Sequence, residues 1–258
     1  QVTLGLRSNP YGLFSGMIIG DVVNFLASLF QSFKLGFSLN NIDFKGLLKT
    51  AKKHWKFPVY HAIPSLLNTI SLTLPVLIIN EFYGDYQTGQ YDLSRLILSL
   101  PMALISISLS QVYLQNMAGK IQKSESIMKL FNNTALTLFL ISLPIIFVVY
   151  FFSEPLFELF FGPQWQDAAK MTSLLIFSQA LKFIVSPLSA SLVALSEVKF
   201  SAIWQTCYFI GIGSLFFMND MSLYDLLTLY LVIDLISYSI YYLIIRNRIV
   251  KYEEKLNK

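Results

Sequence analysis

Long apolar runs alternate with short polar gaps along the whole chain. About seven runs stand out, near 10–33, 58–80, 89–116, 130–152, 168–195, 200–218 and 223–245. A helix that crosses the hydrocarbon core of a bilayer needs roughly 20 apolar residues, and each run is close to that length or longer. The pattern therefore predicts an all-α fold, a polytopic membrane helix bundle with about seven transmembrane helices.

The gaps between the runs alternate in charge. Most Lys and Arg residues fall in every second gap or in the tail, at Lys34, Lys45, Lys49, Lys52, Lys53, Lys56, Lys120, Lys123, Lys129, Lys199, Arg246, Arg248, Lys251, Lys255 and Lys258. The other gaps are acidic, with Glu81, Asp85, Asp92, Glu154, Glu158, Asp167, Asp220 and Asp225. Because Lys and Arg are costly to translocate, basic loops stay in the cytoplasm. The alternation predicts a multi-pass protein of the bacterial inner membrane whose C-terminus is cytoplasmic.

Composition supports a membrane protein and excludes some other classes. Hydrophobic residues make up 55% of the chain and charged residues 13%, about half the ~25% usual in soluble domains. The net charge of +4 lies in short loops rather than on one continuous face, so we expect no nucleic-acid partner. The single Cys207 excludes an intrachain disulfide. Gln1 is not an initiator residue, and we expect the chain to be part of a longer protein that lacks its N-terminal portion here.

Segments at the polar boundaries give further predictions. Residues 41–56 have the pattern of a basic amphipathic helix on the anionic inner leaflet, which would link two lobes. Residues 155–161, ended by Gly162-Pro163, predict a short surface turn or half-helix. Three tryptophans near the ends of runs are expected in the headgroup layer: Trp55, Trp165 and Trp204. Prolines inside the runs are expected to bend their helices: Pro64, Pro75, Pro101, Pro144 and Pro187.

Three ionisable residues lie deep within apolar runs, where a charge costs several kcal/mol unless it is paired or hydrated. Lys182 lies about 18 Å along its helix from Lys170, at ~1.5 Å per residue. It is a candidate substrate-binding residue, or it pairs with a carboxylate on another helix. Asp234 either neutralises Lys182 or takes up a coupling proton or sodium ion. Asp21, in the first run, is a second candidate for ion coupling, unless that span is shifted and Asp21 lies nearer the surface.

Arg95 lies about two turns inside the outer end of the third run. Asp92, three residues earlier, is on the same helix face and can hold it in a local pair. A guanidinium at this depth is also suited to binding phosphate with two parallel hydrogen bonds. Arg95 is therefore, after Lys182, the second candidate for binding substrate in a cavity of the bundle.

The sequence contains no enzymatic constellation. It has neither a Cys or His cluster for a metal nor a glycine-rich phosphate loop before a Lys. With only two histidines in the chain, no serine–histidine–acid set can be proposed. We therefore expect no catalytic residues, no metal and no cofactor, and we do not expect an enzyme.

A series of short motifs resembles a known transporter family. They are Phe57-Pro58-Val59-Tyr60, Ser65-Leu66-Leu67-Asn68, Tyr83-Gly84, Gly89-Gln90-Tyr91, Leu100-Pro101, Ser110-Gln111-Val112 and Phe161-Gly162-Pro163-Gln164-Trp165 with Ala168. In order and spacing, these motifs resemble the oligosaccharide flippases, the O-antigen (Wzx-like) branch of the multidrug/oligosaccharidyl-lipid/polysaccharide exporter superfamily. The resemblance covers most of residues 57–246.

The resemblance implies two six-helix lobes that face each other across a cavity. Residues 1–33 would then be the last helix of a truncated N-terminal lobe, and 34–57 the cytoplasmic linker. Residues 58–246 would form the complete C-terminal lobe, followed by a cytoplasmic tail, 247–258. Family members move undecaprenyl-diphosphate-linked oligosaccharide repeat units across the inner membrane, as in O-antigen and lipopolysaccharide synthesis. The expected partners are this lipid-linked oligosaccharide, membrane lipids and other polysaccharide-assembly proteins.

The sequence is also compatible with other functions. A cation-coupled drug exporter of the same superfamily would use carboxylates to bind cationic substrates, which Lys182 disfavours. A lipid II flippase usually carries additional helices, for which the tail after Arg246 leaves no room. A non-transporting membrane scaffold of a polysaccharide synthesis complex would tolerate removal of the charges at Arg95 and Lys182.

Overall fold

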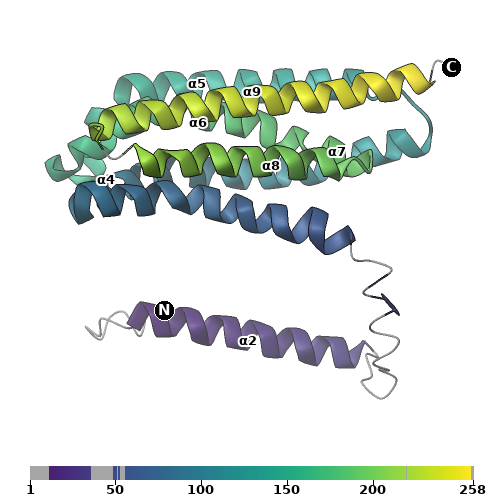
Figure 1. Cartoon of the computed structure of the whole chain (residues 1–258), viewed down its shortest axis with the longest axis horizontal. Coiled ribbons are helices and arrows are strands. Elements are labelled where there is room, and N and C mark those ends of the chain that lie inside the picture. The colour runs from purple at the N-terminus through teal and green to yellow at the C-terminus, as the bar shows by residue number, and fades with distance from the viewer. Residues whose placement is uncertain (1–11, 36–48, 51, 53–55, 219, 257–258) are drawn as a thin grey trace. The chain divides into compact units, whose positions relative to one another are not determined.

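The computed structural model describes residues 12–35, 49, 50, 52, 56–218 and 220–256 (Figure 1). Within these residues the regular structure is entirely helical, which confirms the predicted all-α fold. The chain divides into two compact units, Gln1–Trp55 and Lys56–Lys258.

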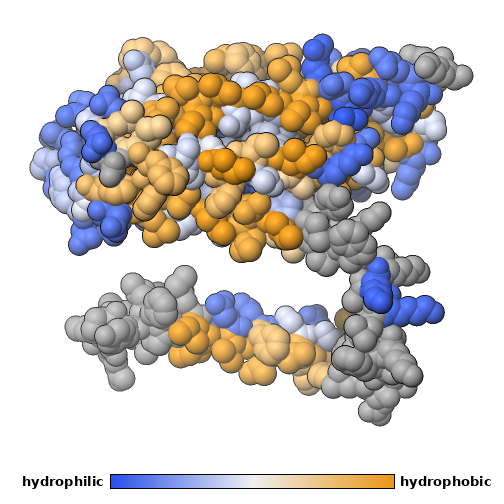
Figure 2. All heavy atoms as spheres, viewed as in Figure 1, coloured by the Kyte–Doolittle hydropathy of each residue, from blue (hydrophilic) through white to orange (hydrophobic). Residues whose placement is uncertain are grey.

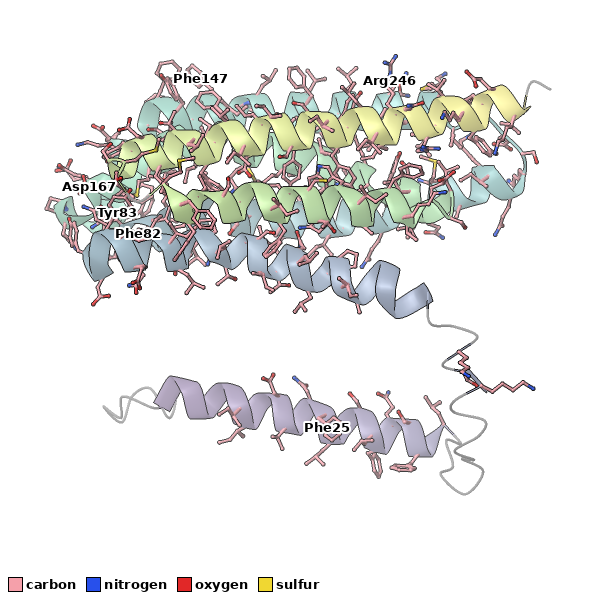
Figure 3. The ribbon with its side chains drawn as sticks, in the orientation of Figure 1. Phe25, Phe82, Tyr83, Phe147, Asp167 and Arg246 are labelled. Carbon is pink, nitrogen blue, oxygen red and sulfur yellow. The ribbon has the colours of Figure 1, made fainter. Side chains whose placement is uncertain are left out.

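The first unit contains one long helix, α2 (Gly12–Lys34). Its 23 residues span about 35 Å at ~1.5 Å per residue, enough to cross a hydrocarbon core of ~30 Å. Apolar side chains such as Ile18 and Phe25 are exposed on it, and Figure 3 shows Phe25 projecting from the helix. Most of the amphipathic helix expected over 41–56, including Trp55, lies outside the described residues.

The second unit is a helical bundle built around α6. In chain order its elements are α4 (Lys56–Gln122), α5 (Met128–Phe161), η2 (Pro163–Trp165), α6 (Gln166–Leu188), α7 (Ala190–Ala194), α8 (Val198–Gly213), η3 (Ser214–Phe217) and α9 (Leu223–Leu256). Helix α6 packs against α4, α5 and α9, and residues such as Leu175, Ile176 and Val185 are fully buried along it.

Helix α4 consists of two arms that fold back on each other at Gly84. A straight helix of its 67 residues would be about 100 Å long, roughly three times the hydrocarbon thickness. Gly84 has φ 82° and ψ 175°, which are not helical values. Beyond this break, Arg95 Nη1 lies 3.4 Å from the carbonyl oxygen of Leu72 on the first arm. The predicted runs 58–80 and 89–116 are these two arms, and the gap between them is helical except at the break.

Gly84→Ala is expected to lower the free energy of unfolding by about 1–3 kcal/mol, because the backbone values at Gly84 are essentially restricted to glycine. Gly89→Ala is the matched control. A Cβ at either position meets nothing within 4 Å, so only the backbone conformation separates the two sites. Since Gly89 is helical, its replacement is expected to stabilise by up to about 1 kcal/mol. Equal effects of both substitutions in SDS titrations of the purified protein would contradict this explanation of the turn.

The other helices differ from the predicted runs mainly at their ends. Helix α5 continues through Pro155 to Phe161 and stops at Gly162, which has φ 93°. The half-helix expected there is therefore the last part of α5. Helix α6 ends at Leu188, directly after Pro187, and α7 begins at Ala190, so the fifth run is broken beside its proline. Helix α9 extends to Leu256, so most of the expected tail continues the last helix.

The second unit has the surface of a membrane protein. The described residues contain five helices that are long and apolar enough to cross a membrane, and α4 is long enough to cross twice. Large apolar side chains such as Leu104, Phe147 and Leu159 are more than half exposed. Figure 2 shows hydrophobic residues over the middle of the bundle and hydrophilic residues at both ends. So much exposed apolar surface requires lipid contact, and the chain is a multi-pass membrane protein.

Hydrogen bonds between different elements hold both ends of the bundle together. At one end the buried Gln90 donates from Nε2 to the carbonyl of Gln164 at 2.8 Å and accepts from the N–H of Ala168 at 2.9 Å. At the other end Glu253 Oε1 accepts from the N–H groups of Ile127 and Met128, at 2.7 and 2.9 Å. A carboxylate at these free N–H groups caps the start of α5, so α9 is tied to the α4–α5 connection.

Candidate functional site

Lys182 of α6 and Asp234 of α9 form a buried ion pair in the bundle. Lys182 Nζ lies 2.5 Å from Asp234 Oδ2, and the two side chains are 9% and 0% exposed. The structure thus brings two of the predicted site residues together and confirms that they pair. An isolated charge at this depth would cost several kcal/mol, and the pair removes most of that cost.

Tyrosine side chains surround the pair. Lys182 Nζ donates a hydrogen bond to Tyr230 Oη at 3.0 Å, and Tyr208 Oη donates to Asp234 Oδ1 at 2.7 Å. The ammonium also lies 5.0 Å and 5.6 Å from the ring centres of Tyr230 and Tyr238, distances at which a cation is attracted to an aromatic face. Both charges are therefore held in fixed positions by polar and aromatic partners.

The apolar pattern of the sequence does not single out these tyrosines, although part of the signal is present in their spacing. Tyr230, Asp234 and Tyr238 are spaced by four residues, which places all three on one face of α9. This spacing predicts that two phenol groups flank the carboxylate. Tyr208 belongs to α8, and only the packing of α8 against α9 reveals its contact.

A stack of aromatic rings adjoins the ion pair. Trp204 lies parallel to Tyr208 and to Tyr241, with ring centres 5.3 and 3.9 Å apart, and its Nε1 donates to the carbonyl of Ser237 at 2.8 Å. Trp204 is only 7% exposed, so its ring packs inside the bundle and not against lipid head groups, as an interfacial anchor would. An indole whose N–H is satisfied inside the bundle gains more from packing than from the interface.

Two pockets meet beside the ion pair. The first, of about 320 Å³, lies between α4, α6, α8 and α9, and its polar lining is Ser65, Asn68, Ser186, Ser189, Ser201 and Gln205. The second, of about 270 Å³, has the polar lining Asn68, Ser99, Ser106, Gln179, Lys182 and Ser186. Asn68, Ser186 and Tyr238 line both pockets. The two pockets therefore adjoin each other, and we call their polar lining residues the polar track. Lys182 lies on this track, and apolar side chains such as Leu72, Met102 and Phe183 line the rest of the second pocket.

Arg95 lies one turn away from this track. Its Nη2 and Nε donate to Asp92 Oδ1 at 2.8 and 3.2 Å, which confirms the predicted local pair. Arg95 precedes Ser99 of the second pocket by four residues, so the two share a face of α4, about 6 Å apart along the axis. Asp21 is exposed on α2, in the other compact unit. The described residues contain no group of three or more His, Cys, Asp or Glu that could hold a metal ion.

Comparisons with known proteins give one family and one distant relative. The model of a family described as "Polysaccharide biosynthesis protein" matches residues 8–170. The teichuronic acid biosynthesis protein TuaB of Bacillus subtilis (strain 168) is 21% identical over 195 residues, which are 75% of this chain and 40% of TuaB. The chain thus spans about two fifths of the length of this relative. No solved structure matches the chain.

Proposed function

Because the chain belongs to the family of polysaccharide biosynthesis proteins, we propose that it is part of a flippase for surface polysaccharide synthesis. Its substrate would be an undecaprenyl-diphosphate-linked oligosaccharide repeat unit, moved across the bacterial inner membrane. The name of TuaB, a teichuronic acid biosynthesis protein, supports a polysaccharide as the final product. A transporter of this kind makes and breaks no covalent bond and needs no catalytic residue.

The observation that carries this proposal is the polar track beside the ion pair of a lipid-embedded bundle. Sugar hydroxyls and a diphosphate cannot cross hydrocarbon without compensating hydrogen bonds. The track supplies hydroxyl and amide groups from three parts of the bundle, represented by Asn68, Ser106 and Gln205. Its occupant can keep its polyprenyl tail in the bilayer while the polar head group moves along the track.

The ion pair suggests how substrate and ion are coupled. In the structure Asp234 neutralises Lys182, so the ammonium is not free to bind an anion. A diphosphate that enters the second pocket would compete with Asp234 for Lys182. The released carboxylate would then take up a proton or a sodium ion. Binding of the substrate to Lys182 would in this way be coupled to binding of the ion to Asp234. Arg95 would bind the diphosphate farther along the path, and Asp21 would be a second coupling carboxylate.

Alternating access would move the head group between the leaflets. Two lobes that rock about a midplane site expose it first to one leaflet and then to the other. In this proposal residues 58–246 are the C-terminal lobe, 1–33 is the last helix of the N-terminal lobe, 34–57 links them and 247–258 is the tail. One end of the bundle, called the Lys-rich end, carries Lys120, Lys123, Lys129 and Lys251. This end and the C-terminus face the cytoplasm, in keeping with the basic loops.

Deleting the full-length gene tests the proposal in cells. We expect undecaprenyl-diphosphate oligosaccharides to accumulate in the lipid fraction while surface polysaccharide is lost. Wild-type protein is expected to restore both levels. Unchanged amounts of lipid-linked sugar, together with new sensitivity to cationic drugs, would instead favour an exporter of cations.

A further inference from the structure

A groove on the lipid-facing side of the bundle lies apart from the polar track. It has a volume of about 390 Å³ and is formed by α5, α6 and α9. Its apolar lining is Ala135, Leu136, Phe139, Leu181, Ile184 and Val185. Ile184 lies on the face of α6 opposite Gln179, Lys182 and Ser186, and Leu181 is turned by 100° or more from each of them, because successive residues turn by about 100° around a helix. The groove therefore opens on a different side of α6 from Lys182, with the exposed side chains of Leu136 and Phe139 at its rim.

Polar and cationic groups lie at one end of this groove. Asn132 and Tyr242 complete its lining, and Tyr242 contacts Phe131 with ring centres 5.4 Å apart, which places α5 and α9 side by side there. Lys129 precedes Asn132 by three residues and Arg246 follows Tyr242 by four, so each lies one turn beyond the groove on the same helix face. Both cations are exposed, and Figure 3 shows Arg246 projecting outward from α9.

The two cations are available for an external anion. Among the ion pairs of the described residues, neither Lys129 nor Arg246 takes part. The nearest carboxylate along α9 is Glu253, whose Oε1 is occupied by the start of α5. Basic pockets between transmembrane helices at the positive end of a protein bind anionic lipid head groups.

We propose that this groove binds one anionic diacyl phospholipid of the leaflet at the Lys-rich end. Lys129 and Arg246 hold its phosphate, and one acyl chain lies along Leu136 and Phe139. The groove from Asn132 to Phe139 is about 10 Å long at ~1.5 Å per residue, which fits within one leaflet of ~15 Å. The site is separate from the proposed transport path and does not depend on it.

Native mass spectrometry of the full-length protein tests the site, with dioleoyl phosphatidylglycerol and dioleoyl phosphatidylcholine as probes. We expect one phosphatidylglycerol to be retained at least tenfold more tightly than phosphatidylcholine. Lys129→Gln with Arg246→Gln is expected to weaken the retention of phosphatidylglycerol about 30-fold, because the double variant removes the attraction of two interfacial cations. Leu136→Trp, which fills the groove and leaves the charges in place, is expected to abolish tight retention.

The charge-matched control is Lys123→Gln with Lys251→Gln, which removes two exposed cations at the same end of the bundle. This variant is expected to retain phosphatidylglycerol within about threefold of the wild type. Exposed cations outside the groove attract the lipid phosphate only weakly, because salt screens them. Equal loss in both double variants, or tight retention in Leu136→Trp, would overturn the proposal. Displacement of the bound lipid by equimolar undecaprenyl phosphate would overturn it as well, by showing a different occupant.

Discussion

Asp234→Ala is expected to lower the free energy of unfolding of the purified full-length protein by about 3–5 kcal/mol, because it leaves a buried charge without its partner. Lys182 would retain only Tyr230 as a hydrogen-bond acceptor and the faces of two tyrosine rings. Neither replaces a carboxylate at 2.5 Å. Lys182→Met is expected to destabilise the protein as well, because it leaves the buried Asp234 without its cation. SDS titration in mixed micelles measures both values.

The double variant Lys182→Met with Asp234→Asn separates pairing from packing. It leaves neither charge at the position of the buried pair, its methionine fills much of the lysine volume, and the asparagine can still accept from Tyr208. It is therefore expected to recover most of the stability lost in Asp234→Ala. A double-mutant cycle of the wild type, Lys182→Met, Asp234→Asn and the double variant is expected to give a coupling energy of about 2–3 kcal/mol. Strictly additive effects would contradict the pair seen in the structure.

An exposed pair at the Lys-rich end is the matched control. Lys120 Nζ lies 3.0 Å from Glu125 Oε2 in the α4–α5 connection. The hydrogen bond and the charge of Lys120 lower the pKa of the Glu125 carboxyl. Because both groups remain solvated, replacing them with Gln is expected to change stability little. This variant removes an ion pair without disturbing the polar track.

Cells that carry Lys182→Met with Asp234→Asn are expected to assemble less than about a tenth of the wild-type surface polysaccharide. A tenfold loss corresponds to a barrier raised by only about 1.4 kcal/mol, and this variant removes both the cation for the diphosphate and the carboxylate for the coupling ion. Polymer and lipid-linked precursor are quantified at matched protein levels. The Lys120→Gln with Glu125→Gln control is expected to behave as the wild type.

This second prediction also distinguishes transport from a scaffold role. A non-transporting scaffold needs only a folded bundle, which the double variant is expected to keep. Normal polymer in cells with the double variant would therefore support a scaffold and would remove Lys182 and Asp234 from the mechanism.

Much of the architecture could be predicted because its signals are local. The length of each apolar run sets a crossing, and the two arms of α4 and the long helices α5 and α9 follow these runs. The motifs from Phe57 to Ala168 indicated the family that the match to residues 8–170 shows. The pairing of Lys182 with Asp234 could be anticipated because a charge at that depth requires a partner.

The details that the sequence did not predict depend on packing between helices. Trp204 is amphipathic and close to the end of a run, which is also the pattern of an interfacial anchor. Only the stack with Tyr208 and Tyr241 places it inside the bundle. The gap around Gly84 is polar enough to indicate a loop, but the backbone needs just one glycine to reverse direction. Helix propensity on both sides keeps the remaining residues of that gap helical.

Reconstitution of the full-length protein tests the central claim most directly. Proteoliposomes would contain an undecaprenyl-diphosphate oligosaccharide in both leaflets, and a membrane-impermeant glycosidase added outside would cleave the exposed sugars. We predict that the initially protected fraction becomes cleavable over time with the wild type but not with Lys182→Met and Asp234→Asn. Protection identical to that of protein-free liposomes, from a protein verified as folded, would contradict a flippase.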